Sequence, residues 1–135
     1  MRPNPFRSTR EAHGRETAED YVELISNLIQ ESGEARTVDL ANALAISSVT
    51  VTKTLKRLQK EGLISSQPYR SIFLTEAGHA MAKSCQERHK LVHDFLLAIG
   101  VDEATAETDA EGIEHHVSQS TLQSMQNFLE RQAKP

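Results

Sequence analysis

The sequence has one cysteine, no tryptophan and few aromatic residues. Because Cys85 stands alone among 135 residues, a disulfide within the chain and a multi-cysteine zinc site are excluded. Aromatic residues make up 4% of the chain, so its core must come from aliphatic side chains. No hydrophobic run approaches the roughly 20 residues of a membrane helix, and residues 1–10 lack the apolar stretch of a secretory signal. We therefore expect a cytoplasmic protein with no membrane partner.

The net charge of −4 conceals two segments of opposite charge. Between Ser47 and Arg70 there are five basic side chains and Glu61 as the single acidic one, a net charge of +4. Residues 101–116 carry six acidic side chains and no lysine or arginine. This asymmetry indicates one segment that meets phosphates and another that meets cations. The alternative is two solvated surfaces of opposite charge.

Hydrophobic periodicity predicts three helices in the first half of the chain. The first covers Glu11–Glu31, and the second is a short helix capped by Thr37 with Asp39 in its first turn. The third begins after Ser47 as its N-cap, and Gly62 ends it. Its inward side chains are expected to be Val51, Leu55 and Leu58.

Two short strands, 63–66 and 71–75, are predicted to follow as a hairpin with its turn at 67–70. The order helix, helix, basic helix, hairpin is typical of a winged helix-turn-helix, which binds double-stranded DNA through its second paired helix. The alternative is an amphipathic helix whose basic outer face is simply solvated. The candidate DNA-contacting residues share an outward position on the basic helix or the wing, and they are Ser48, Thr50, Thr52, Lys53, Lys56, Arg57 and Arg70.

The rest of the chain is predicted to be helical over 76–99, over 101–116 after the break at Gly100, and once more near the C-terminus. So small a helical segment has little core of its own, and we expect it to form a homodimer. The fold class is thus mainly α. The domains are a flexible N-terminal arm (1–15), a winged helix-turn-helix of three helices and a two-stranded wing (16–75), and an all-helical dimerisation and metal-binding domain (76–135).

Carboxylates and histidines at helical spacing suggest a metal site. Asp20 and Glu23 lie within about 60° of each other beside the apolar face of the first helix. Glu111, Glu114 and His115 share one face of the acidic helix, and His89 is their natural partner because the chain folds back at Gly100. This oxygen-rich set with some nitrogen suits Mn(II) or Fe(II), and it is large enough for about two ions per subunit with a bridging carboxylate. Taken alone, the Asp20–Glu23 pair is a common pattern that indicates a solvated helix edge. His93 is interpreted as a partly buried helix histidine.

Four segments together resemble the manganese-transport-regulator branch of the diphtheria toxin repressor family: EDYVELI, AISSVTVTKTLKRLQKEGLI, ERHKLVHDFLLAIGV and DAEGIEHHVS. The resemblance extends from about Ala18 to Phe128 and implies the manganese ligands Asp20, Glu23, His89, Glu111, Glu114 and His115. Iron-sensing relatives carry Met and Cys at the positions of Asp20 and Glu111, so the resemblance favours manganese. Because the turn Ser47–Thr50 varies within the family, it implies no operator sequence.

The sequence therefore predicts a Mn(II)-dependent transcriptional repressor of manganese uptake genes, with Fe(II) as the second candidate metal. It is expected to act as a homodimer on a palindromic DNA operator, with the metal joining the DNA-binding and dimerisation domains. No catalytic residue, organic cofactor or small-molecule substrate is expected, and the chain is not expected to be an enzyme. Two alternatives stay open: a metal-independent winged-helix regulator whose acidic tail dimerises, and a small metal-dependent hydrolase.

Overall fold

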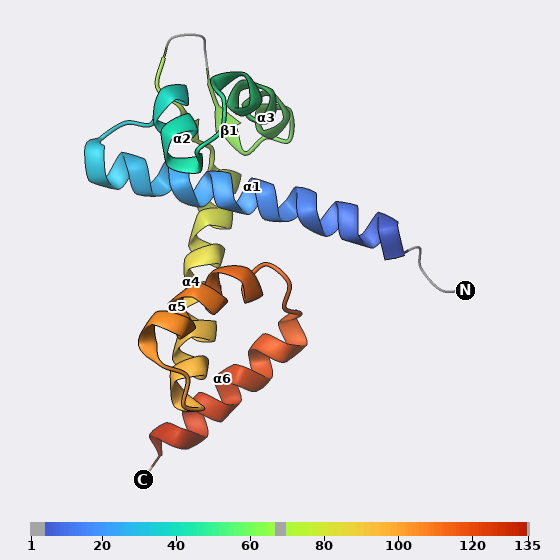
Figure 1. The fold of residues 1–135 in the computed structure, drawn as a ribbon, viewed down its shortest axis with the longest axis vertical. Helices are drawn as coiled ribbons and strands as arrows, with labels where there is room; N and C mark the ends of the chain where they lie inside the picture. The colour runs from blue at the N-terminus through green and yellow to red at the C-terminus, as the bar shows by residue number, and fades with distance from the viewer. Residues whose placement is uncertain (1–4, 67–69, 135) are drawn as a thin grey trace. The chain divides into compact units, whose positions relative to one another are not determined.

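The computed structural model describes residues 5–66 and 70–134, without the side chains of residues 5–10 and 12. This part of the chain is mainly helical, as predicted, and contains no helix long and apolar enough to cross a membrane. Its elements (Figure 1) are α1 (Pro5–Ser32), α2 (Thr37–Leu44), α3 (Ser48–Lys60), β1 (Ile64–Ser65), β2 (Phe73–Leu74), α4 (Glu76–Ala98), α5 (Glu103–Ile113) and α6 (Gln119–Ala133).

The chain divides into two compact units. The winged-helix unit is Thr17–Lys83, and the helical unit consists of the described residues of Met1–Glu16 and Ser84–Pro135. Helices α1 and α4 each contribute residues to both units.

The winged-helix unit has an aliphatic core. Val51, Leu55 and Leu58 of α3 are at most 5% exposed. They belong to one buried cluster with Ile25 of α1 and Leu40 of α2. The predicted inward face of the third helix is thereby confirmed. Because this face is packed against two other helices, the opposite face of α3 is held outward by a close-packed scaffold.

Helix starts agree with the sequence at α3 and differ at α2. Ser47 is the N-cap of α3, as predicted, and its Oγ accepts the backbone N–H of Thr50 at 3.2 Å. At α2 the predicted cap is wrong, because Arg36 is the N-cap and Thr37 is the first helical residue. The backbone N–H of Arg36 donates to Oδ2 of Asp39 at 3.0 Å. Because Asp39 is the third helical residue, this bond stabilises the start of α2, and no hydrogen bond from the Thr37 hydroxyl is needed for it.

The wing is a hairpin with shorter strands than predicted. β1 and β2 pair antiparallel, with Ile64 opposite Leu74 and Ser65 opposite Phe73. The second strand stops before Thr75 because the Thr75 Oγ1 accepts the N–H of Gly78 at 3.1 Å at the start of α4. The predicted turn residues 67–69 lie outside the described residues.

Helix α1 begins at Pro5, earlier than the predicted start at Glu11. The sequence predicts an arm over residues 1–15, whereas residues 5–15 are helical. Proline is well tolerated in the first turn of a helix, where its missing N–H needs no partner. Extending a helix that already exists costs far less than nucleating a new one, so a polar segment without periodicity continues α1. Residues 1–4 of the predicted arm lie outside the described residues.

The helical unit has a small core formed by one buried side chain each from α4, α5 and α6. Val92 of α4, Ala110 of α5 and Leu122 of α6 make up its buried centre. The chain turns between α4 and α5 at Gly100, whose φ of 101° favours glycine. Asp102 then caps α5, since its carboxylate accepts the N–H of Thr105 at 3.0 Å. The predicted succession of three helices with a break at Gly100 is confirmed.

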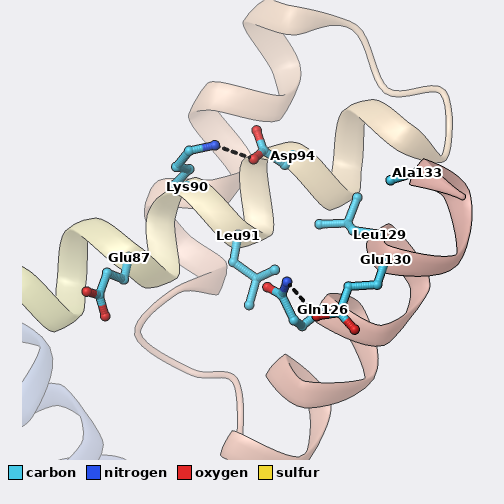
Figure 2. Close-up of a pocket in the computed structure, with 8 residues that line it drawn as sticks. All are labelled: Glu87, Lys90, Leu91, Asp94, Gln126, Leu129, Glu130 and Ala133. Atoms are coloured by element: carbon cyan, nitrogen blue, oxygen red, sulfur yellow. Dashed lines mark hydrogen bonds and ion pairs between the residues drawn. The ribbon is translucent and has the colours of Figure 1, made fainter.

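A groove of about 450 Å³ lies between α4 and α6 in the helical unit (Figure 2). Leu91 and Leu129 supply its apolar lining, and the Lys90–Asp94 ion pair at 2.7 Å stands on the α4 side. Leu129 and its neighbour Phe128 are half-buried. Such incompletely covered apolar side chains fit a unit that buries more surface when it associates with a second copy.

Candidate metal centre and DNA interface

His89, Glu111 and Glu114 come together in the helical unit. His89 lies on α4, Glu111 on α5, and Glu114 directly after α5 as its C-cap. The Nδ1 atom of His89 is 3.6 Å from Oε1 of Glu111 and 3.5 Å from Oε2 of Glu114. One ligand atom from each of the three residues lies within 4.8 Å of the others. These separations suit donors that share one ion.

Burial makes this cluster chemically unusual. The Glu114 side chain is 0% exposed, and His115 beside it is 3% exposed. Removing a carboxylate from water is costly unless positive charge or hydrogen bonds compensate it. The Glu114 carboxylate has ion-pair contacts of 3.5 Å to His89 and 3.6 Å to Nε2 of His115, both longer than a strong hydrogen bond.

The donor atoms fit a divalent cation. Within the described ranges, the buried Nδ1 of His89 has no hydrogen-bond partner, although it points at two carboxylates. Carboxylate oxygens with imidazole nitrogen suit Mn(II) and Fe(II), and thiolate-preferring ions are disfavoured. The Glu111 side chain is 56% exposed, so water has access to one side of the cluster.

A second histidine extends the cluster along α4. The His93 ring stacks on His89 with centroids 6.1 Å apart, and its Nε2 is 3.0 Å from Oε1 of Glu103. Glu107 contacts both histidines, at 3.0 Å from Nε2 of His89 and 3.6 Å from Nε2 of His93. Sequence reasoning gave no role to Glu103 and Glu107. Glu103 and Glu107 are four residues apart, like His89 and His93, so each pair lies on one face of its helix. This matched spacing is the sequence signal from which the two glutamates could have been predicted.

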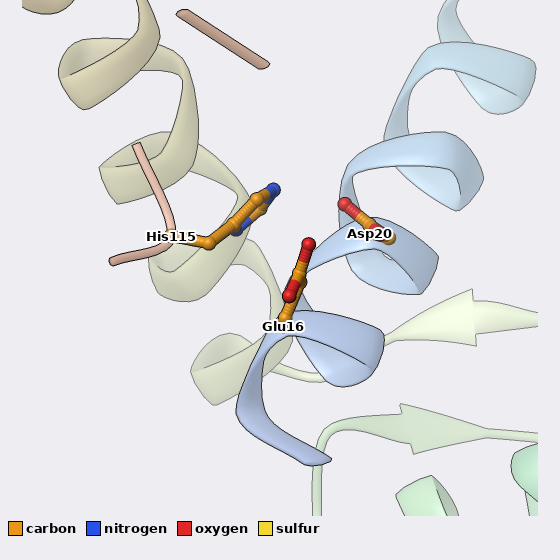
Figure 3. Close-up of side chains that lie close together, drawn as sticks. All are labelled: Glu16, Asp20 and His115. Atoms are coloured by element: carbon orange, nitrogen blue, oxygen red, sulfur yellow. The ribbon is translucent and has the colours of Figure 1, made fainter. Parts of the chain in front are cut away.

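Glu16 was also missed by sequence reasoning. Its Oε2 is 3.0 Å from Nε2 of His116, and its carboxylate has an oxygen within 4.8 Å of a His115 ring nitrogen. All three residues belong to the helical unit. Figure 3 shows Glu16 and Asp20 on successive turns of α1. The spacing of four residues between Glu16 and Asp20 is the sequence signal that could have drawn attention to Glu16. It does not indicate the partner of Glu16, which lies 100 residues further along the chain.

The two remaining predicted ligands lie on the part of α1 in the winged-helix unit. Asp20 is exposed and Glu23 is half-buried, one turn apart. The structure thus brings His89, Glu111 and Glu114 together, with His115 against Glu114, and places Asp20 and Glu23 on the other unit. The metal-binding role of all six stays a prediction.

Each predicted DNA-contacting residue is exposed. The α3 residues among them are held by the core on the opposite face of the helix. Two of the threonine hydroxyls are engaged within α3, since Thr50 Oγ1 lies 2.9 Å from Ser47 Oγ and Thr52 donates to the Ser48 carbonyl at 2.8 Å. The lysines Lys53 and Lys56 extend from the outer face.

Comparisons with known families cover both units. The family model of the iron dependent repressor N-terminal DNA binding domain matches residues 15–72. The model of the metal binding and dimerisation domain of the same repressors matches residues 75–134. The chain belongs to the iron-dependent repressor family. Members of this family are metal-dependent DNA-binding regulators, and this chain is one of them.

Relatives refine this assignment. Transcriptional regulator MntR of Escherichia coli O157:H7 is 52% identical over 126 residues, 93% of this chain and 81% of the relative. HTH-type transcriptional regulator MntR of Bacillus subtilis (strain 168) is 40% identical over 112 residues, 83% of this chain and 79% of the relative. The resemblance to the manganese-transport-regulator branch is therefore confirmed.

Solved structures share the fold. A manganese-dependent transcriptional repressor in complex with manganese superposes with a TM-score of 0.73 at 27% identity, covering 84% of this chain and 52% of that one. The manganese regulator SloR gives a TM-score of 0.71 at 25% identity, covering 84% and 53%. The chain spans about half the length of these solved proteins.

Proposed function

We propose that the chain is a homodimeric, Mn(II)-dependent repressor of manganese uptake genes. The observation that carries this proposal is the fully buried Glu114 beside Nδ1 of His89. A buried carboxylate that faces an imidazole and a second carboxylate is stabilised best by a cation. The names of the relatives, among them a manganese-dependent repressor, support Mn(II) over other divalent ions.

The proposed ligands are drawn from both units: Asp20, Glu23, His89, Glu111, Glu114 and His115. Six side chains, four of them carboxylates, are enough to hold about two ions with a bridging carboxylate. Bound divalent cations would place positive charge beside these four carboxylates. Fe(II) prefers similar donors and is the second metal to test.

The distribution of the ligands suggests how metal binding controls DNA binding. Asp20 and Glu23 belong to the unit that carries α3, and the other four belong to the unit matched by the dimerisation domain. Donors that share ions restrict how one unit moves relative to the other. In a dimer, this restriction holds two α3 helices at a separation that fits two half-sites of a palindromic operator, about one helical turn of DNA or a multiple apart.

The proposal is tested with one variant and a matched control. Glu114→Gln removes the buried charge and keeps the shape, whereas Asp109→Asn makes the same change at an exposed position of the same acidic helix. DNA binding is measured by fluorescence anisotropy with Mn(II), Fe(II), Co(II), Zn(II) or a chelator. The duplex is one that the Mn(II)-loaded protein selects from a random-sequence pool, and calorimetry counts the bound ions.

We expect Mn(II) to strengthen DNA binding by the wild type and by Asp109→Asn, and to have no effect on Glu114→Gln. Light scattering should show that all three proteins are dimers. Equal DNA affinity in Mn(II) and in chelator would overturn the proposal in favour of a metal-independent regulator. An unchanged Mn(II) response of Glu114→Gln would remove the proposed site.

A further inference from the structure

The wing has too few strand residues to be stable by itself. Each strand has two residues, with Ile64 opposite Leu74 and Ser65 opposite Phe73. A two-stranded hairpin is only marginally stable in water, so contacts with the rest of the winged-helix unit must fix this one. The position of Arg70, the exposed wing residue predicted to contact DNA, therefore depends on what the residues beside it contact.

The loop between α1 and α2 holds the second half of the wing. The backbone N–H of Ile72 donates to the Ala35 carbonyl at 2.8 Å, and both residues are completely buried. One residue earlier in each segment, the Ser71 hydroxyl donates to Oε2 of Glu34 at 3.0 Å. The two bonds thus follow each other along both segments, the first in the core and the second at the surface. Arg70 comes directly before the residues that these bonds fix.

The Glu34 carboxylate is itself held in place. Its Oε1 accepts the Nε–H of Arg36 at 3.0 Å, so its two oxygens have different partners. Hydrogen bonds from Arg36 and from Ser71 hold the pKa of Glu34 below its ordinary value. The ionised carboxylate is a stronger acceptor for the Ser71 hydroxyl than a neutral group. The backbone of Arg36 is fixed in turn, because its N–H donates to Asp39 in the first turn of α2.

These contacts lie at the surface, where they add little to global stability. The side chains of Glu34 and Arg36 are 49% and 47% exposed, and exposed ion pairs contribute little to the free energy of unfolding. Their effect is local, since they restrict Ser71 and with it the backbone from which Arg70 extends. A side chain whose backbone is already ordered loses less entropy when it binds a partner.

We propose that Glu34 is a positioning residue for the wing: through the Ser71 hydroxyl it fixes the backbone that carries Arg70 to a DNA phosphate. This inference rests on the proposed DNA-binding function and adds to it a role for an acidic residue. On charge alone, removing a carboxylate from a DNA-binding unit should strengthen DNA binding. If Glu34 positions the wing, removing it should weaken DNA binding.

The experiment compares Glu34→Ala, Ser71→Ala and Arg70→Gln, each alone, with double variants that combine either alanine substitution with Arg70→Gln. DNA affinity is measured by fluorescence anisotropy at several salt concentrations, with a duplex selected by the Mn(II)-loaded wild type. Glu31→Ala is the matched control, because Glu31 is an exposed glutamate of α1 and the substitution removes the same charge. Thermal melting shows whether each variant is folded.

Glu34→Ala and Ser71→Ala should each weaken DNA binding about threefold, as expected from freeing one side chain at an interface. Glu31→Ala should bind at least as tightly as the wild type. Arg70→Gln should weaken binding and reduce the slope of log affinity against log salt concentration by about 0.9. In its presence the two alanine substitutions should have no further effect, because the charge that they position is gone.

A conservative variant separates the hydrogen bond from the charge. Glu34→Gln removes the charge and keeps a side-chain oxygen that can accept the Ser71 hydroxyl, so it should bind DNA more tightly than Glu34→Ala. DNA binding by Glu34→Ala that equals or exceeds that of the wild type would overturn the inference. The same holds for Arg70→Gln that binds like the wild type, and for a loss in Glu34→Ala that is equally large with and without Arg70.

Failure of the inference is distinguishable from failure of the proposed function. If DNA affinity is the same in chelator as in Mn(II), the metal dependence is wrong, while the comparison of Glu34→Ala with Glu31→Ala still reports on the wing. If the loaded protein selects no sequence from the pool, both the proposed function and the role of Glu34 fall.

Discussion

The Nδ1 atom of His89 lies 3.5 Å from Oε2 of Glu114, whose side chain is completely buried. The two residues come from different helical segments of one unit, so their approach is produced by the packing of α5 on α4. Burying a carboxylate costs free energy, and a cation bound beside it would offset part of that cost. Folding stability should therefore depend on metal.

Mn(II) should raise the thermal stability of the wild type and leave that of Glu114→Gln unchanged. A ligand that binds only the folded state, at one site, adds about 2.7 kcal/mol to the free energy of unfolding when its free concentration is 100 times its Kd. Calorimetric melting with Mn(II) and with chelator measures this effect. A Mn(II)-induced rise in the Tm of Glu114→Gln equal to that of the wild type would contradict this account.

The cap of α5 should make stability depend on pH. The Thr105 hydroxyl, and then its backbone N–H, hold the pKa of Asp102 below its ordinary value. The ionised carboxylate is thus favoured in the folded state, so its contribution is complete above the unfolded pKa and is lost as the pH falls through the folded pKa. Asp102→Ala should lower the Tm at neutral pH, and the difference from the wild type should shrink in acid.

Ser118 provides the matched control for this pH dependence. It caps α6 through its hydroxyl, which accepts the N–H of Thr121 at 3.2 Å. Because a serine hydroxyl does not ionise in this range, the Tm loss in Ser118→Ala should stay constant across the same pH series. A loss in Asp102→Ala that is equally constant would show that the charge of Asp102 has no part in the cap.

Lys56 should contribute to DNA affinity without regard to sequence. If its ammonium group meets a phosphate, Lys56→Gln should weaken binding to all duplexes by a similar factor. It should also reduce the slope of log affinity against log salt concentration by about 0.9 for each phosphate that the lysine neutralises. Lys90→Gln, which removes the same charge from the ion pair with Asp94 on the helical unit, should leave the slope unchanged. A salt slope unaffected by Lys56→Gln would remove Lys56 from the interface.

The parts of the fold that sequence predicted are those set by local periodicity. Val51, Leu55 and Leu58 recur at helical spacing, and Ser47 precedes them with a side chain suited to an N-cap. The start of α1 was wrong because helix extension from an existing helix leaves no hydrophobic pattern in residues 5–10. The cap of α2 was wrong because threonine is a common N-cap residue and arginine is not, whereas the helix start here is stabilised by the bond from the Arg36 backbone N–H to Asp39.

In the candidate site, too, local spacing predicted some residues and left others undetected. The spacing of Glu111, Glu114 and His115 was readable as one helix face, and His89 was predicted from the chain reversal at Gly100. The Glu16–His116 hydrogen bond joins residues 100 positions apart, and no local pattern reports such a contact. Sequence also could not show that Glu114 is buried, because burial here results from packing between helices.

Gly78 should be required for the wing to pack on α4. A Cβ atom at this position would overlap the Leu63 carbonyl oxygen and crowd the Leu74 side chain. The carbonyl also accepts the N–H of Thr75 at 3.1 Å, so it is not free to move aside. Gly78→Ala should therefore lower the free energy of unfolding by about 1–3 kcal/mol, as overpacking of a core does.

Gly14→Ala is the control, since nothing lies within 4 Å of a Cβ at that helical position. It should raise stability by about 0.5–1 kcal/mol through helix propensity. Urea denaturation measures both changes, and equal stability of Gly78→Ala and wild type would show that the wing and α4 separate without cost.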